Sequence, residues 1–232
     1  MCAQVQVIVN ASTIKGCLMR YRRVPDETVR RMPLYLRGVR ILTKQGQSCI
    51  SSKSLADCLS ISAWQIRKDF SYFGELGKPG VGYDAVKLEK QISKFLNLVR
   101  GHNVVLIGVG NLGSAILSFT GFRQYGFNII AAFDCDANVI GEKKGPVVVE
   151  DVSNISRLKT NSVDLGIIAV PVSAAQEVAD VLVAIGVKGI LNFAPLHINV
   201  PKKVRIVTID IAMELARLPY YMTASPSQGA WE

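Results

Sequence analysis

Long apolar segments are missing from this chain of 232 residues. Its longest apolar runs, such as VDLGIIAVPV, are far too short to cross a bilayer. The apolar stretch VQVIV near the N-terminus is not preceded by the basic residues that open a secretory signal. Apolar residues still make up 49% of the chain, which is enough for a packed core. We therefore expect a cytoplasmic globular protein, of one large domain or two small ones, that does not act at a membrane.

Cysteine pairs and histidine clusters are also missing. The five cysteines form no C-x-x-C pair and no zinc-ligand spacing; they are Cys2, Cys17, Cys49, Cys58 and Cys135. Such a scattered, odd-numbered set indicates reduced thiols in the cytoplasm, with a free reactive thiol as the alternative. The only histidines are His102 and His197. We predict no metal site from this set of side chains.

Acidic residues are scarce in one half of the chain. Residues 1–100 hold 17 Lys and Arg against 7 Asp and Glu, whereas residues 101–232 hold 10 against 11. The net charge of +9 therefore belongs to the first half. A polyanionic partner for that half is one interpretation, and an ordinary solvated basic surface is the other.

The basic half predicts helices that follow an N-terminal arm. Residues 1–25 have no clear period and predict a loosely ordered arm, or a start placed too early. DETVRRMPLYLRGVRILTKQG predicts a helix that begins with acidic residues and ends at Gly46. SSKSLADCLSIS predicts a short second helix that Ser52 caps, with an apolar stripe made of Leu55, Ala56 and Leu59.

The third predicted helix has two different faces. Ser62 and Gln65 have the spacing of a capping box that opens it. At about 100° per residue, its core face holds Ile66, Phe70 and Phe73. Its outer face holds Trp64, Arg67, Lys68 and Ser71. A basic outer face one short turn after another helix indicates a helix-turn-helix, whose second helix enters the major groove of DNA. A solvated helix face is the alternative.

Glycines follow this helix closely. FGELGKPGVGY, residues 73–83, predicts a tight β-hairpin whose tip holds Lys78, Pro79 and Gly80. Beside the recognition helix this hairpin would be a wing that reaches a neighbouring groove or a phosphate, whereas a plain turn is the alternative. Residues 85–100 predict a connecting helix, because apolar residues recur at helical spacing; they are Leu88, Ile92, Phe95, Leu96 and Val99.

A nucleotide-binding fingerprint opens the second half. NVVLIGVGNLGSAILSF predicts a strand, then Gly108-x-Gly110-x-x-Gly113, then a helix, which is the context that this motif requires. Gly108 permits the tight turn, and Gly110 lets a pyrophosphate approach the backbone. Gly113 lets the helix pack closely, so that its first N–H groups face the phosphates.

Asp134 ends the next predicted strand, NIIAAFD, 24 residues after Gly110. A carboxylate at this point would accept hydrogen bonds from both ribose hydroxyls of the adenosine and repel a 2′-phosphate. It therefore favours NAD(H) over NADP(H), and it disfavours CoA as the ligand. A role that only caps the loop is the alternative.

Further strands predict a doubly wound parallel α/β sheet. SVDLGIIAVP, KGILNFAP and VRIVTID are predicted strands, and SAAQEVADVLVAIG is a helix between the first two. The residues at strand ends, where such sheets bind ligands, are Val170, Pro171, Asn192 and Phe193. An ordinary turn is the alternative for NFAP.

A dehydrogenase needs a proton donor or base near the nicotinamide, and the sequence shows no pattern that would supply one. His102 precedes the fingerprint strand, at the wrong end of the sheet, and no Y-x-x-x-K spacing accompanies His197. We therefore predict no catalytic residue and no enzyme activity. An NAD-dependent oxidoreductase that carries a DNA-binding domain is the alternative function.

The motifs together resemble a known family. QIRKDFSYFGELGK, GVGY, GVGNLGSA, AVPVSAAQEVAD and KGILNFAP, in this order, are similar to the Rex family of redox-sensing transcriptional repressors, over about residues 26–222. The resemblance implies a homodimer with a winged helix-turn-helix domain at 26–100 and a Rossmann NAD(H)-binding domain at 101–207. It implies a helix exchanged between subunits within 208–232. Such a dimer would bind inverted-repeat operator DNA and release it when NADH rises relative to NAD⁺.

The resemblance also implies roles for individual residues. The implied DNA contacts are Gln65, Arg67, Lys68, Ser71, Tyr72, Lys78 and Gly80. The implied cofactor site consists of Gly108, Gly110, Asn111, Leu112, Gly113, Phe119, Asp134, Val170, Pro171, Asn192 and Phe193. The implied switch consists of Arg37, Phe119 and Asp210. The chain departs from the family pattern here, because Phe119 stands where a tyrosine hydroxyl would bridge Arg37 and Asp210. Pro79 stands where relatives often carry a cation in the wing.

Overall fold

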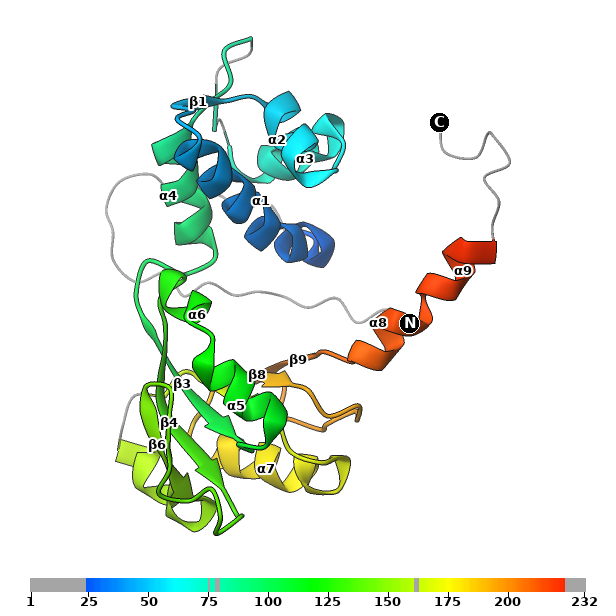
Figure 1. Ribbon diagram of the computed structural model, residues 1–232. Coiled ribbons are helices and arrows are strands. Elements are labelled where there is room, and N and C mark those ends of the chain that lie inside the picture. Colours follow the sequence, from blue (N-terminus) through cyan, green and yellow to red (C-terminus); the bar gives the residue numbers. More distant parts are fainter. Residues whose placement is uncertain (1–23, 75, 78–79, 161–162, 224–232) are drawn as a thin grey trace. The chain divides into compact units, whose positions relative to one another are not determined.

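The computed structural model describes residues 24–74, 76–77, 80–160 and 163–223 (Figure 1). The predicted arm, apart from Val24 and Pro25, lies outside these ranges, and so do Lys78 and Pro79 of the predicted wing tip. The chain divides between Val99 and Arg100 into two compact units. Each unit is described by itself.

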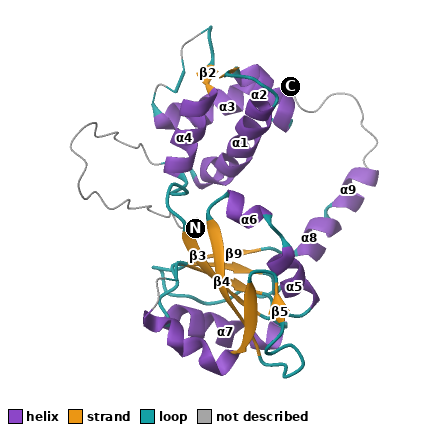
Figure 2. Cartoon of the chain, turned by 60° about the vertical axis from the view of Figure 1, so that its left-hand side comes forward, coloured by secondary structure: helices purple, strands orange, loops and turns teal. Residues whose placement is uncertain are grey.

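The N-terminal unit is mainly helical (Figure 2). Its elements are α1 (Asp26–Lys44), β1 (Cys49–Ile50), α2 (Ser52–Leu59), α3 (Ala63–Phe70), the 3₁₀ turn η1 (Ser71–Phe73), β2 (Tyr83–Asp84) and α4 (Ala85–Phe95). Its core is built from apolar residues at helical spacing; the buried ones include Met32, Leu36, Val39, Leu55, Ile66, Phe70, Leu88 and Ile92. The predicted connecting helix ends earlier than its apolar pattern suggested, since Val99 lies beyond α4 and is exposed.

The helix-turn-helix prediction is confirmed, with corrections to its caps. Residues 60–62 join α2 to α3, and Ser60 takes the left-handed conformation, φ 54°, that ends α2. Ser51, not Ser52, caps α2, because its hydroxyl and that of Ser54 each accept the other's backbone N–H. Ser62 caps α3 as predicted, but the Gln65 side chain turns to Asp69 instead of closing a box.

The predicted hairpin is wrong in its first strand. Strand β2 pairs antiparallel with β1, so its partner Cys49–Ile50 comes from upstream of α2. Gly77 still lies close to Gly82, since a Cβ at Gly77 would lie 2.5 Å from the Gly82 carbonyl oxygen. The two strands of this small sheet are therefore distant in sequence. Their pairing gives the backbone N–H and C=O groups of each strand hydrogen-bond partners on the other.

The C-terminal unit is built around a seven-stranded sheet. Its elements are β3 (His102–Ile107), α5 (Asn111–Ser118), α6 (Gly121–Gln124), β4 (Phe127–Asp134), β5 (Lys143–Lys144), β6 (Val147–Asp151), η2 (Val152–Thr160), β7 (Leu165–Ile168), α7 (Val172–Ala184), β8 (Gly189–Asn192), β9 (Arg205–Thr208), α8 (Ile211–Ala216) and α9 (Leu218–Thr223). The strand order is β5-β6-β4-β3-β7-β8-β9, and every pair is parallel except β5 with β6. The predicted doubly wound sheet is confirmed, and the edge strands β5 and β6 were not predicted.

Helices cover the two faces of this sheet. The helix α7 and the turn η2 pack on one face around Phe133, Ile168 and Leu182. On the other face, α5 and Phe122 of α6 pack around Leu106 and Ile167. Successive strands are added on one side of β3 up to β6 and on its other side from β7 onward, so the strand order changes direction beside β3. Because β3, β4, β7 and β8 are parallel, their C-terminal ends lie at one edge of the sheet. None of the helices in the described part of the chain is both long and apolar enough to cross a membrane.

Candidate DNA-binding and dinucleotide-binding sites

The recognition helix has the two faces that its sequence predicts. Ile66 and Phe70 are buried, while the outer side chains of Trp64, Arg67 and Lys68 are exposed. The Arg67 guanidinium donates to the Ser52 hydroxyl at 3.2 Å, and the Lys68 ammonium lies 4.8 Å from the centroid of the Trp64 ring. The outer face is therefore cationic, with its charges accessible to a polyanion.

The other predicted DNA contacts lie at the end of α3 and beyond it. Ser71 is exposed, and its hydroxyl donates to the Lys68 carbonyl at 2.7 Å. Tyr72 lies half-buried in η1, and Gly80 lies exposed with a φ of 79°. Gln65 lies on the flank of α3 beside the first helix, where its amide donates to Asp69 at 2.9 Å. Lys78 lies outside the described residues.

Asp69 was not predicted as an important residue, yet it joins the recognition helix to α1. Its carboxylate is buried, with 1% of its surface exposed. It accepts hydrogen bonds from the Thr28 hydroxyl at 2.9 Å, the Tyr35 hydroxyl at 2.6 Å and two guanidinium nitrogens of Arg31 at 2.6 and 3.0 Å. Burial alone would raise the pKa of Asp69, but the hydrogen bonds from Arg31, Tyr35, Thr28 and Gln65 outweigh it and lower that pKa.

The glycine fingerprint is shaped by close backbone contacts. Gly108 has a φ of 93°, and a Cβ there would lie 2.5 Å from the Ala169 carbonyl oxygen. A Cβ at Gly113 would overlap the Gly108 carbonyl oxygen. Gly110, the N-cap of α5, has open space around the position of a Cβ. Gly108 and Gly113 are therefore required by the fold, whereas Gly110 leaves room for a ligand.

The start of α5 completes the fingerprint. Asn111 and Leu112 are its first two residues, so their backbone N–H groups have no carbonyl partner one turn earlier in the helix. Both residues are exposed. Such N–H groups, aligned with the helix dipole, are suited to a phosphate.

Asp134 lies where β4 ends and supports the fingerprint directly. One carboxylate oxygen accepts the Val109 N–H at 2.6 Å, and the other accepts the N–H groups of Cys135 and Asp136 at 2.7 and 2.9 Å. Burial would raise the pKa of Asp134, but the backbone hydrogen bonds from Val109, Asp136 and Cys135 outweigh it and lower that pKa. The carboxylate is thus ionised at neutral pH. It also caps the loop after β4, which is the alternative role that the sequence suggested.

The strand-end residues lie at the same edge of the sheet. Val170 and Pro171 follow β7, and Pro171 is the N-cap of α7. Asn192 ends β8 and is buried; its amide nitrogen donates to the Ala194 carbonyl at 2.8 Å, and its amide oxygen accepts the Ala194 N–H at 2.9 Å. Asn192 therefore shapes the turn that holds the half-buried Phe193.

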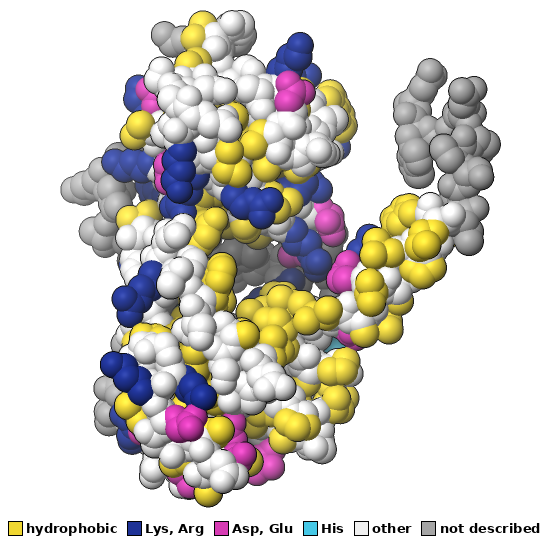
Figure 3. All heavy atoms as spheres, in the orientation of Figure 1, with side chains coloured by type: hydrophobic (Ala, Val, Ile, Leu, Met, Phe, Trp, Pro, Cys, Tyr) yellow, Lys and Arg dark blue, Asp and Glu magenta, His cyan; other side chains and the backbone are white. Residues whose placement is uncertain are grey.

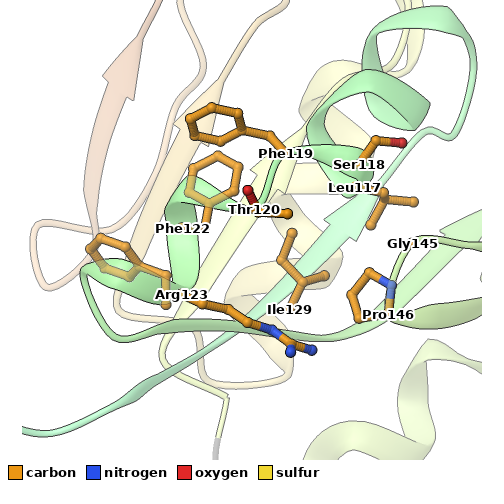
Figure 4. A pocket seen from close by; sticks show the side chains of 10 residues that line it. Leu117, Ser118, Phe119, Thr120, Phe122, Arg123, Ile129, Gly145 and Pro146 are labelled. Carbon is orange, nitrogen blue, oxygen red and sulfur yellow. The ribbon is translucent and has the colours of Figure 1, made fainter.

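Phe119 follows α5 and is 62% exposed. Its ring meets Phe122 edge to face, with centroids 5.2 Å apart, at the rim of a cavity of about 300 Å³ (Figure 4). Leu117, Ile129 and Pro146 also line this cavity, with Arg123 beside them. The surroundings of the ring are mostly apolar, as suits a phenylalanine.

The remaining switch residues lie in different units. Arg37 is exposed on α1 of the N-terminal unit. Asp210 belongs to the C-terminal unit, where its carboxylate accepts the Met213 N–H at 3.1 Å and caps α8. A pair between Arg37 and Asp210 stays a prediction.

The two histidines lie apart. His102 is buried at the start of β3, with its Nδ1 3.8 Å from Asp164, at the end of the strand opposite the fingerprint. His197 is exposed after β8. Among the described residues no group of three His, Cys, Asp or Glu side chains is arranged to hold a metal ion.

Comparison with known proteins assigns the chain to a family. A family model described as "Putative DNA-binding protein N-terminus" matches residues 23–71, and one described as "CoA binding domain" matches residues 100–196. The redox-sensing transcriptional repressor Rex of Chloroflexus aggregans is 45% identical over 199 residues, which cover 85% of this chain and 94% of that protein. The chain belongs to the Rex family. The Rex repressor of Streptomyces coelicolor is 40% identical over 203 residues, which cover 87% of this chain and 79% of that protein.

Solved structures agree with the Rex assignment. The crystal structure of RSP, a Rex-family repressor, in complex with β-NAD⁺ and operator DNA has a TM-score of 0.81 and 36% identity, covering 86% of this chain and 92% of that one. RSP in complex with β-NADH has a TM-score of 0.77 and 34% identity, covering 86% and 94%. The Rex fold, a winged helix followed by a Rossmann sheet, is therefore the fold of this chain.

Proposed function

We propose that this chain is a redox-sensing transcriptional repressor that binds operator DNA and releases it when NADH rises relative to NAD⁺. One observation carries the proposal: a cationic, exposed recognition helix and a glycine fingerprint shaped for a dinucleotide occur in one chain of the Rex family. The similarity to RSP, whose structures hold NAD⁺ with operator DNA and NADH, supports both ligands.

Operator DNA is bound by the N-terminal unit. The recognition helix α3 enters a major groove, where Arg67 and Lys68 meet phosphates or base edges. Gln65, Ser71 and Tyr72 supply further hydrogen bonds. Lys78 and Gly80, in the wing, reach a neighbouring phosphate. The Lys and Arg side chains displace counterions from the DNA phosphates, so the affinity for DNA should fall as the salt concentration rises.

The dinucleotide is bound at the C-terminal edge of the sheet. Its pyrophosphate lies against Gly110 and the first N–H groups of α5. The Asp134 carboxylate, ionised and held by three backbone N–H groups, accepts a ribose hydroxyl of the adenosine at its remaining acceptor position and repels a 2′-phosphate. The nicotinamide lies near Pro171 and Phe193, where a neutral dihydronicotinamide is accepted better than the cationic ring of NAD⁺.

The chain acts as a homodimer in the cytoplasm. The helices α8 and α9 carry a row of exposed apolar side chains, which are Ile211, Met213, Leu215, Leu218, Tyr220, Tyr221 and Met222 (Figure 3). Monomeric proteins rarely expose so much contiguous apolar surface. Exchange of this segment with a second subunit would bury it and would couple the two recognition helices, one for each half of an inverted repeat.

The switch couples the two ligands through the dimer. If NADH lowers the affinity for DNA by some factor, DNA must lower the affinity for NADH by the same factor, and couplings of about 1–3 kcal/mol are typical. With Phe119 in place of a tyrosine, the cofactor state is sensed through the shape of this ring and an Arg37–Asp210 pair. No turnover of substrate is needed for this function.

A direct experiment is fluorescence anisotropy of a labelled AT-rich inverted-repeat duplex. The duplex is titrated with the full-length protein, and the complex is then titrated with NADH and, separately, with NAD⁺. Release at a much lower concentration of NADH than of NAD⁺ is the expected result. Equal release by both forms would contradict redox sensing. Steady reduction of NAD⁺ by a hydroxy or amino acid, which gives NADH and the oxidised acid, would indicate an oxidoreductase instead.

A further inference from the structure

Trp64 is the largest exposed apolar side chain on the outer face of α3. Its exposed fraction is 60%, although large aromatic side chains are highly buried on average in folded proteins. It is the second residue of the recognition helix. The N-terminal residues of such helices are the ones that contact base edges in helix-turn-helix proteins.

The packing of α3 keeps the Trp64 ring outside the protein. Ile66 and Phe70 fill the core on the opposite face. Asp69 and Gln65 hold the flank of the helix, through the hydrogen bond between them and the bonds from Asp69 to α1. A rotation of α3 that buried the indole would expose this core and break these bonds. The fold therefore fixes the exposure of Trp64.

Lys68 gives this ring a cationic neighbour. The ammonium lies 4.8 Å from the ring centroid, within the range of about 6 Å where a cation is attracted to an aromatic face. The pair presents an apolar plane next to a positive charge. A major groove has matching chemistry, because it exposes thymine methyl groups between two rows of phosphates.

We propose that the Trp64 indole packs on thymine 5-methyl groups in the major groove, with Lys68 facing the adjacent phosphate. This inference rests on the proposed DNA-binding function and adds a specificity-determining residue to it. Uracil offers the same hydrogen-bonding groups as thymine without the methyl group. Replacing thymine by uracil therefore removes the contact with Trp64 and leaves the base pair.

The test compares thymine with uracil in one duplex. The probe is a labelled inverted-repeat duplex that the wild-type full-length protein selects from a random pool, together with copies that hold deoxyuridine at single thymidine positions. Wild type is expected to lose about fourfold in affinity for each contacted methyl group, the factor for one buried methylene-sized group. Trp64→Ala is expected to bind the thymine and uracil copies equally at those positions.

Control variants separate this contact from other effects. Trp64→Phe keeps an aromatic face and should keep part of the discrimination. Val86→Ala shortens an α4 side chain that is 71% exposed. This variant should distinguish thymine from uracil as well as wild type does. The slope of affinity against salt should be the same in wild type and Trp64→Ala, since no charge is removed. Wild type and Trp64→Ala are each compared on the thymine and uracil copies. An effect of uracil on DNA shape is the same for both proteins and cancels, so the difference that remains measures the contact between Trp64 and the methyl group.

Two results would overturn the inference while leaving the repressor function in place. One is discrimination between thymine and uracil that persists in Trp64→Ala. The other is a wild-type protein that binds the thymine and uracil copies equally at every position, so that no methyl group contributes to the affinity. If wild type selects no duplex at all, the DNA-binding function and this inference fail together, which is a different result from either of these.

Discussion

Replacing Asp69 by asparagine should lower the unfolding free energy of the N-terminal unit by about 3 kcal/mol. Removing one member of a buried ion pair costs about 3–5 kcal/mol, because the partner charge is left uncompensated. Arg31 is 25% exposed and can turn partly toward water, which places the estimate at the lower end. The asparagine amide nitrogen would also face donors, because Thr28, Arg31 and Tyr35 all donate to this carboxylate.

The assay uses Trp64 as a local reporter. The chain has two tryptophans, and a Trp231→Phe background leaves Trp64, on α3, as the only one. Guanidinium titrations followed by Trp64 fluorescence then report the unfolding of this unit. Asp57→Asn is a matched control, because it removes an exposed carboxylate from α2 and should change stability by less than about 0.5 kcal/mol.

The same carboxylate makes the stability depend on pH. The pKa of Asp69 is lower in the folded protein than in the unfolded chain, so the folded state binds fewer protons at low pH. Its contribution is complete above the unfolded pKa of about 4 and is lost as the pH falls through the lowered folded pKa. The difference between wild type and Asp69→Asn should therefore shrink below about pH 4. A difference below about 1 kcal/mol at neutral pH, or one that does not shrink in acid, would refute this account of Asp69.

Other substitutions separate the two sites. Gly110→Ala places its methyl group in open space, so the melting temperature should hold while NADH binding, followed by cofactor fluorescence, weakens about tenfold; equal affinity would mean that no pyrophosphate approaches there. Gly113→Ala overlaps the Gly108 carbonyl and should lower the melting temperature itself. Arg67→Ala should weaken DNA binding and reduce the salt slope by about one in anisotropy titrations, and an unchanged slope would place Arg67 away from phosphate. Phe119→Tyr should increase the coupling free energy between NADH and DNA by about 0.5–1.5 kcal/mol, the net contribution of one hydrogen bond. The affinity for DNA without NADH should not change.

Periodicity was sufficient to predict the faces of α3 and the doubly wound parallel sheet. Both depend on local patterns, since Ile66 and Phe70 share a helical face and Gly108 to Gly113 follow an apolar strand. The position of β1 could not be predicted, because a strand of two residues has no period and its partner Tyr83 lies beyond two helices. The adjacent serines Ser51 and Ser52 allowed two caps, and only the backbone conformation decides between them.

Asp69 shows why part of the site is hidden in the sequence. It stands between Lys68 and Phe70, where an acidic residue looks like another exposed position of a charged helix. Its donors on α1 lie 34 to 41 residues upstream, and no spacing rule connects them. The exposed face could be recognised from its own residues, but the network that holds that face in place depends on how two helices pack.

Asp134 combines the two roles that its sequence position left as alternatives. Three backbone N–H groups occupy part of the carboxylate, which offers about four acceptor positions. About one acceptor position is left for a ribose hydroxyl, while the bond to Val109 holds the turn between β3 and α5 in shape. A turn ordered in advance reduces the entropy lost on binding. Because Asp134→Ala would release this turn and remove the ribose acceptor together, a loss of NADH affinity in that variant could have either cause. Gly110→Ala leaves the Asp134 bonds in place, and it is therefore the substitution that isolates recognition of the dinucleotide.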